Sequence, residues 1–175
     1  MKIGKVIAFL VLSYILLASI ALGQSNLTAS ANVSITIVKA LQIEQIQGDL
    51  NFGELVQSGV SSKLQRTPDK GILFAVTGNA GKNVVVDYHN TLFNNRSASQ
   101  NNSSQNSIQF IPEINTTYSN SSYSNAQSVI NGSSYPLQNK DGFGVLYLWV
   151  GGEMDIDSKL ASGDYTGEFA VTVSY

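Results

Sequence analysis

The chain has 175 residues, a formal net charge of −2, and only 13% Asp, Glu, Lys and Arg. Nucleic acids and anionic membranes are bound through clustered Lys and Arg, so this composition argues against both as partners. The sequence has no cysteine and one histidine. It therefore excludes disulfides and thiol nucleophiles and lacks the usual ligand sets for zinc.

The first 23 residues differ from the rest of the sequence. Two lysines precede an apolar run from Val6 to Leu22, and small residues stand one and three positions before a cut at Gln24. This pattern is typical of a secretory signal peptide, so residues 1–23 are predicted to be cleaved and the mature protein to be secreted or held at the cell surface. Two alternatives stay open. In the first, the run is kept as a membrane anchor, because it just reaches the roughly 17 residues that a membrane-spanning helix needs. In the second, the chain is cut after Gly4 and the run is kept as the core helix of a filament, as in archaeal type IV pilins.

The next segment, 24–37, contains the most regular alternation in the chain. Apolar residues occupy every odd position from Ala29 to Ile37, with Ser, Asn and Thr between them. Such a period of two predicts a strand with one apolar face. Period-two runs continue through residues 38–175, where no amphipathic helical window occurs. In chain order, the further predicted strands are Leu41 to Ile46, Asp49 to Leu55, Ile72 to Gly78, Asn83 to Tyr88, residues 107–114, Phe143 to Val150, Glu153 to Asp157 and residues 163–175.

Turn residues and polar stretches separate these strands. Gly78, Asn79 and Gly81 predict a hairpin, and Asn131-Gly132 and Gly151-Gly152 predict turns. Two low-complexity stretches, 94–107 and 115–127, have nothing to bury and are predicted loops. Between them, residues 107–114 contain a proline, which favours an edge strand.

Together these elements predict an all-β, immunoglobulin-like Greek-key β-sandwich of about eight to ten strands, with a closed barrel as the alternative. The sandwich domain is expected to span residues 38–175. Within it, Trp149 lies in an apolar strand and is expected in the core. The final run places one set of side chains on a single face: Phe169, Val171, Val173 and Tyr175.

The sequence offers little that resembles a catalytic or metal site. His89 stands at a predicted strand end without the G-x-S-x-G context of a hydrolase and is expected to be a surface residue. Asp155 and Asp157 share one face of a strand, and Met154 and Ile156 share the other, which is typical of a solvated face opposite a core. An isolated Asp-x-Asp falls short of the roughly six to eight oxygens that calcium takes. We therefore expect no enzyme, no metal and no cofactor.

Sequons for N-glycosylation, N-x-S/T, are frequent in the polar stretches. A glycan is a large hydrophilic group that needs access to water, so a loop is the favoured place for it. The candidate acceptors are Asn26, Asn32, Asn95, Asn101, Asn102, Asn115, Asn120 and Asn131.

Four stretches carry a family resemblance: DLNFGEL, ILFAVTG, LYLWVGGEMDI and SGDYTGEFAVTVSY. They resemble a secreted domain-of-unknown-function family of bacteria and archaea, family 4402, over nearly all of the predicted mature chain. More distantly, the layout is similar to spore coat protein U and the archaic chaperone-usher pilins. That resemblance implies an incomplete immunoglobulin-like fold that is completed by the N-terminal strand of a neighbour. The chain lacks the cysteine pair that follows the first strand in those pilins.

A sandwich that lacks one strand exposes an apolar groove and unpaired backbone groups, which a strand from another chain can fill. The segment 24–37 has the required alternation and is the predicted donor, and the face of the last strand is the predicted acceptor. Such head-to-tail contacts need not close, so copies of the chain would form a filament for adhesion or biofilm formation. The residues expected to face the groove are Leu27, Ala29, Ala31, Val33, Ile35 and Ile37.

The sequence is also compatible with two alternatives to strand exchange. The segment 24–37 pairs within its own subunit as the first strand of a complete sandwich, or the protein is a monomeric surface module that binds carbohydrate. For the second alternative, the aromatic residues available for stacking on sugars are Tyr118, Tyr123, Tyr135 and Trp149. If the protein is adhesive, host or neighbouring cell surfaces are further expected partners. We expect no nucleic-acid partner, and no membrane partner after the signal peptide is cleaved.

Overall fold

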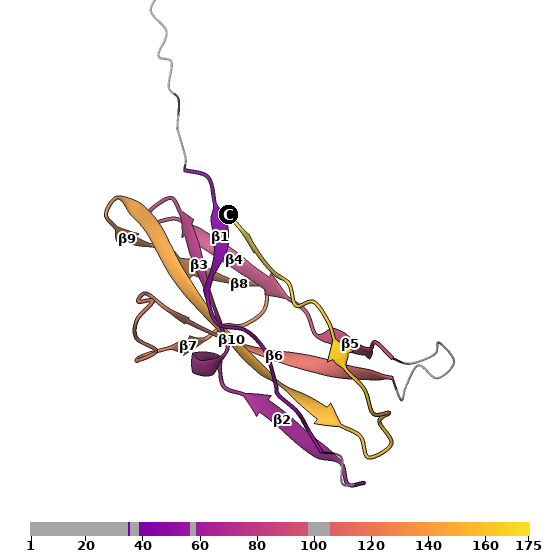
Figure 1. Ribbon diagram of the computed structural model, residues 1–175. Coiled ribbons are helices and arrows are strands. Elements are labelled where there is room, and N and C mark those ends of the chain that lie inside the picture. The colour runs from indigo at the N-terminus through magenta and orange to yellow at the C-terminus, as the bar shows by residue number, and fades with distance from the viewer. Residues whose placement is uncertain (1–34, 36–38, 57–58, 98–105) are drawn as a thin grey trace, which may run out of the picture. The chain divides into compact units, whose positions relative to one another are not determined.

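The computed structural model describes residues 35, 39–56, 59–97 and 106–175 (Figure 1). The chain divides into two units, Met1–Ile37 and Val38–Tyr175, and only the second is described beyond a single residue. Apart from one 3-10 turn, η1 (Pro68–Lys70), the regular structure of the described residues is all β. The strands are β1 (Gln42–Gln47), β2 (Ser62–Arg66), β3 (Ile72–Gly78), β4 (Asn83–Tyr88), β5 (Thr91–Asn95), β6 (Ser107–Thr117), β7 (Gln127–Ser128), β8 (Ser133–Pro136), β9 (Gln138–Lys140), β10 (Phe143–Ile156), β11 (Tyr165–Thr166) and β12 (Val171–Ser174).

Two antiparallel sheets make up the sandwich, as the sequence predicts. The larger sheet has the order β1-β3-β10-β6-β5-β11, with β2, β7 and β9 attached beside this path. The smaller sheet has the order β12-β4-β8. The long strand β10 organises the larger sheet because it pairs with β3, β6, β2 and β9 along its length.

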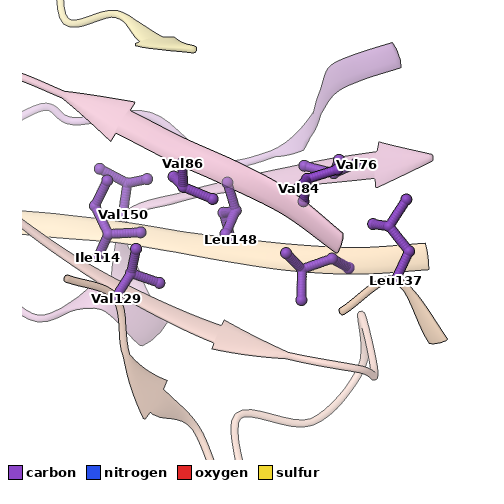
Figure 2. Close-up of a cluster of buried hydrophobic side chains, with 9 residues drawn as sticks. Val76, Val84, Val86, Ile114, Val129, Leu137, Leu148 and Val150 are labelled. Atoms are coloured by element: carbon purple, nitrogen blue, oxygen red, sulfur yellow. The ribbon is translucent and has the colours of Figure 1, made fainter. Parts of the chain in front are cut away.

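The main core lies between the two sheets, and its buried side chains are all aliphatic. Val84 and Val86 of β4 have no exposed surface, and Figure 2 shows them facing Leu148 and Val150 of β10. Alternation explains the arrangement, because successive side chains of a strand point to opposite faces of a sheet. Further members of this cluster are Val76, Ile114, Val129, Leu137 and Leu146.

The outer face of β3 and β10 is covered as well. Leu73, Val145, Tyr147 and Trp149 form a second buried cluster there. The Tyr123 ring packs edge-on against Trp149, with 5.5 Å between centroids. Strand β10 is therefore apolar on both faces, which is why its sequence reads as a continuous hydrophobic run and not as a clean alternation.

The Gly151-Gly152 pair does not form the predicted turn. Phe143 to Ile156 is one continuous strand, which exchanges its partner β3 for β2 at this point. A Cβ on Gly151 would lie 2.6 Å from the backbone nitrogen of Pro68. Glycine is present here because another backbone segment approaches the strand closely and leaves no room for a side chain. Such a close approach is a common reason for glycine inside a strand.

The predicted hairpin around Gly78 to Gly81 is also wrong. The turn itself exists, with Gly81 at φ 75°. However, β3 belongs to the larger sheet and β4 to the smaller one, so the turn carries the chain across the core. Local turn residues cannot distinguish a hairpin from a crossing between sheets. The Asn131-Gly132 turn is confirmed, with Gly132 at φ 73° and Ser133 N donating to Ile130 O.

Strand β6 is longer and more central than predicted, because it pairs with β10 on one side and with β5 and β7 on the other. The predicted edge strand and the first residues of the predicted loop 115–127 both belong to it. Pro112 is tolerated because it lies between the stretch paired with β5 and the stretch paired with β7. Across from Pro112, β10 contributes Gly152. The strand predicted over Asp49 to Leu55 is absent from the regular structure, although Leu50 and Phe52 do point inward.

Candidate functional site

The candidate site is an open side of the sandwich between β1 and β12. In the described part of the chain, β1 pairs only with β3, and β12 pairs only with β4. Each therefore keeps one edge of backbone N–H and C=O groups without a strand partner. Exposed strand edges of this kind are templates for pairing with a further strand.

One end of the opening is held closed by Tyr175. Its hydroxyl donates to Lys39 O at 3.1 Å and accepts from Asn79 N at 2.8 Å. Leu41 comes close at the same place, because its Cδ1 lies 3.1 Å from where a Cβ on Gly78 would stand. The segments before β1 and after β12 are therefore tied together here. We call this the closed end.

The four residues of the predicted acceptor face differ in burial. Phe169, Val171 and Val173 are half-buried and pack against the main core, while the residues between them are exposed. Tyr175 differs, because its side chain is 51% exposed and only its hydroxyl is anchored. Leu41 and Leu50 contribute partly buried side chains from the other flank of the opening.

Beyond β1 and β12, a cavity of about 1030 Å³ lies between the segment that follows β1 and the segment that precedes β12, and we call this cavity the wide end. Residues 50–55 form one wall and residues 160–167 form the other. The remaining lining includes four buried apolar side chains from three strands, Phe93, Ile108, Met154 and Ile156. Polar and charged side chains, among them Glu54, Arg96 and Asp164, line the cavity as well, so it offers both apolar and polar surface to an occupant.

Aromatic contacts connect the two walls beneath the cavity. The Phe110 ring is fully buried and packs edge-on against Phe52 of one wall and Phe169 beyond the other, at 5.9 and 5.8 Å between centroids. Phe93 packs against the same ring at 5.7 Å. Phe110 is thus the common support of both flanks of the opening. No short motif in the sequence marks Phe93 or the cavity, and Phe110 stands out only as an apolar residue of the predicted strand 107–114.

The predicted donor residues lie almost wholly outside the described residues. Ile35 is the exception, and its side chain is 84% exposed. The signal peptide, residues 1–23, and the remaining donor positions, Leu27, Ala29, Ala31, Val33 and Ile37, are outside the described part. Within that part, no helix has the length and apolar character needed to cross a membrane.

The residues considered for chemistry are on the surface. His89, Asp155 and Asp157 are exposed, whereas Met154 and Ile156 are buried, as predicted. Lys63 Nζ lies 2.8 Å from Glu153 Oε1 and 3.7 Å from Asp155 Oδ1. The hydrogen bond to Glu153 raises the pKa of Lys63. Among the described residues, no three His, Cys, Asp or Glu side chains are grouped so as to hold a metal ion.

The aromatic side chains considered for sugar stacking differ in their surroundings, and Tyr118 is exposed. Trp149 is 7% exposed, and its Nε1 donates to Thr117 Oγ1 at 2.8 Å. Tyr123 covers it, and burial raises the pKa of the Tyr123 hydroxyl, which is bonded to Asn115. The Tyr135 hydroxyl accepts from Ile130 N. Trp149 is therefore part of a packed cluster, as expected, and its ring faces are occupied by protein.

The sequon asparagines differ in their surroundings. Asn95 is buried and Asn115 half-buried, and in each the amide Nδ2 that a glycan would modify already donates a hydrogen bond, to Ser162 O and to the Tyr123 hydroxyl. Asn120 and Asn131 are exposed. The remaining sequons, Asn26, Asn32, Asn101 and Asn102, fall outside the described residues.

A family model for a domain of unknown function, DUF4402, matches residues 41–175. The chain belongs to this family. The DUF4402 match begins at Leu41, beside the closed end, and runs to Tyr175, so it includes both flanks of the opening. The predicted donor segment precedes it. No curated protein matches the chain.

Proposed function

We propose that this DUF4402 protein is a structural subunit of an extracellular, pilus-like filament, in which each copy receives a donor strand from its neighbour. The observation that carries the proposal is the open side of the sandwich. Two strand edges that have no partner among the described residues flank a half-buried apolar lining, and the segment just before β1 has the alternation of a strand with one apolar face. Addition of a strand to such an edge gives affinity through backbone hydrogen bonds and specificity through alternate side chains.

The apolar donor residues contribute favourable free energy to the contact. Burying Val33, Ile35 and Ile37 contributes about 5–9 kcal/mol before the cost of ordering the segment, at roughly 1.5–3 kcal/mol for each side chain. The contact joins different surfaces on the two copies, so it is heterologous and extends without closing. A signal peptide would deliver the subunit outside the cell, where the filament serves adhesion or biofilm formation. Exposed Asn120 and Asn131 are the described positions best placed to carry glycans.

Placing a charge in the donor segment tests this proposal. We expect Ile35→Asp to abolish surface filaments in electron micrographs, because an aspartate in an apolar groove loses its hydration without gaining a partner. Thr36→Asp is the matched control, because it puts the same charge on the face that points away from the groove, and it should leave filaments in place. If Ile35→Asp cells carry filaments in normal numbers, the donor has no part in assembly and the proposal fails.

A further inference from the structure

We infer that the donor segment enters the opening of the neighbouring copy in one direction only, antiparallel to β12, with its small residues at the closed end and its large residues in the wide end. This inference deepens the proposed function and rests on it. It commits the opening to one occupant, which is residues 27–37 of a second copy.

The width of the opening changes along its length. At the closed end, the Tyr175 hydroxyl bridges Lys39 O and Asn79 N, so little room remains beside Tyr175. At the wide end, the cavity of about 1030 Å³ lies beside Tyr165 and Gly167. The opening therefore accepts small side chains at one end and large side chains at the other.

The donor segment has a matching gradient. Its inward positions read Ala29, Ala31, Val33, Ile35 and Ile37, so side-chain size rises toward the C-terminal end. With the alanines at the closed end, the register that best matches sizes puts Ala29 opposite Tyr175 and Ile37 opposite Gly167. Successive inward positions of the donor then face Val173, Val171 and Phe169, which are the half-buried residues of the acceptor. In an antiparallel pair, directly opposite side chains lie on the same face, as this register requires.

The position of Lys39 determines which type of assembly this donor direction produces. Lys39 lies at the closed end of its own sandwich, because its carbonyl accepts the Tyr175 hydroxyl and its ammonium group lies 3.5 Å from the centre of the Phe143 ring. The donor thus leaves each sandwich from the closed end. If its last residue, Ile37, lies in the neighbour's wide end, the closed end of one copy meets the wide end of the next. The same contact then repeats along a line, which is the geometry of an open filament.

The opposite direction gives a different product. With Ile37 at the neighbour's closed end, two closed ends would meet, and the two copies could exchange segments mutually in a closed dimer. Insertion of the segment into its own sandwich requires this opposite direction too, because Ile37 is only two residues from Lys39. Both arrangements would place the isoleucines where the opening is tied shut and the alanines beside the cavity. Size complementarity therefore disfavours both self-pairing and the closed dimer.

Engineered disulfides distinguish the two directions, and the absence of native cysteine makes the background clean. Outward-facing positions are used so that packing is not disturbed. Ser174 and Glu168 are exposed on the acceptor, and Ser30 and Thr36 point outward on the donor by alternation. The inferred register pairs Ser30 with Ser174 and Thr36 with Glu168, and opposite Cβ atoms about 4.5–5.5 Å apart suit a disulfide.

The full chain carrying Ser30→Cys with Ser174→Cys, or Thr36→Cys with Glu168→Cys, should give a ladder of cross-linked multimers on a non-reducing denaturing gel after mild oxidation. The crossed pairs, Ser30→Cys with Glu168→Cys and Thr36→Cys with Ser174→Cys, should give at least tenfold less product. Each single variant is the control for random collision. A second measurement mixes two single variants, Ser30→Cys and Ser174→Cys, in which only contacts between copies can form a disulfide; it should give cross-linked dimers.

The possible outcomes test the direction of the donor strand separately from the proposed filament. A ladder from the crossed pairs would overturn the direction and leave the filament intact. A shifted monomer band from the crossed pairs would show self-pairing, and a dimer band alone would show the closed exchange; either would overturn the inference and the filament together.

Discussion

Replacing Phe110 with alanine is expected to lower the free energy of unfolding by about 3–5 kcal/mol, among the largest effects of any single core truncation. The Phe110 ring has no exposed surface and packs against Phe52, Phe93 and Phe169. Its removal leaves a void where both flanks of the opening are supported. Because natural domains have only about 5–15 kcal/mol of stability, such a loss would leave the fold marginal.

This expectation is checked by urea unfolding in the Ile35→Asp background, where exchange between copies should not perturb the equilibrium. Phe143→Ala is the matched control. The Phe143 side chain is 53% exposed, and its main contact is Lys39 above the ring. Its loss should cost about 1 kcal/mol or less, as expected for an exposed cation–π pair. Equal losses for the two variants would mean that Phe110 is not the support described here.

Gly151→Ala is expected to destabilise the domain by about 3 kcal/mol, because a methyl group at this position collides with backbone and not with a movable side chain. The added Cβ would stand 2.6 Å from Pro68 N and 2.7 Å from Thr67 C. Strand β10 would have to move away from the segment after β2. Thermal unfolding followed by circular dichroism measures the effect.

Gly59→Ala is the control for the conformational freedom of glycine. Gly59 has a φ of +76°, and a Cβ there would meet nothing within 4 Å. Its replacement should therefore cost only the strain of the left-handed region, about 1–2 kcal/mol. If Gly151→Ala proved as mild as this control, the close approach to Pro68 would not be what requires glycine in β10.

Composition and alternation were enough to predict the class of fold. The runs in β1, β3 and β12 were located from their period of two, the run in β4 from its β-branched residues, and the run in β10 from its continuous apolar stretch. The half-burial of Phe169, Val171 and Val173 followed from the same rule, because one face of a strand at the side of a sandwich must cover the core. These features depend only on residues close together in the chain.

Features that depend on residues far apart were not predictable. Gly151 was predicted to be in a turn because glycine is common in turns. The sequence does not show that the backbone of Pro68 lies close to this glycine in the fold. Residues 107–114 looked like an edge because of Pro112, whereas the arrangement of β5, β7 and β10 around it decided its place. The wide end was missed for the same reason. Its lining comes from segments as distant as Phe52 and Tyr165, which no local pattern connects.

The most direct test of the central claim is a cryo-EM reconstruction of the native surface filament. We expect a strand between β1 and β12 in every copy, traceable to residues 27–37 of the neighbour, with Ile37 at the wide end and Ala29 at the closed end. A reconstruction in which that strand belongs to the same chain, or in which neighbouring copies touch elsewhere and the opening is empty, would contradict it.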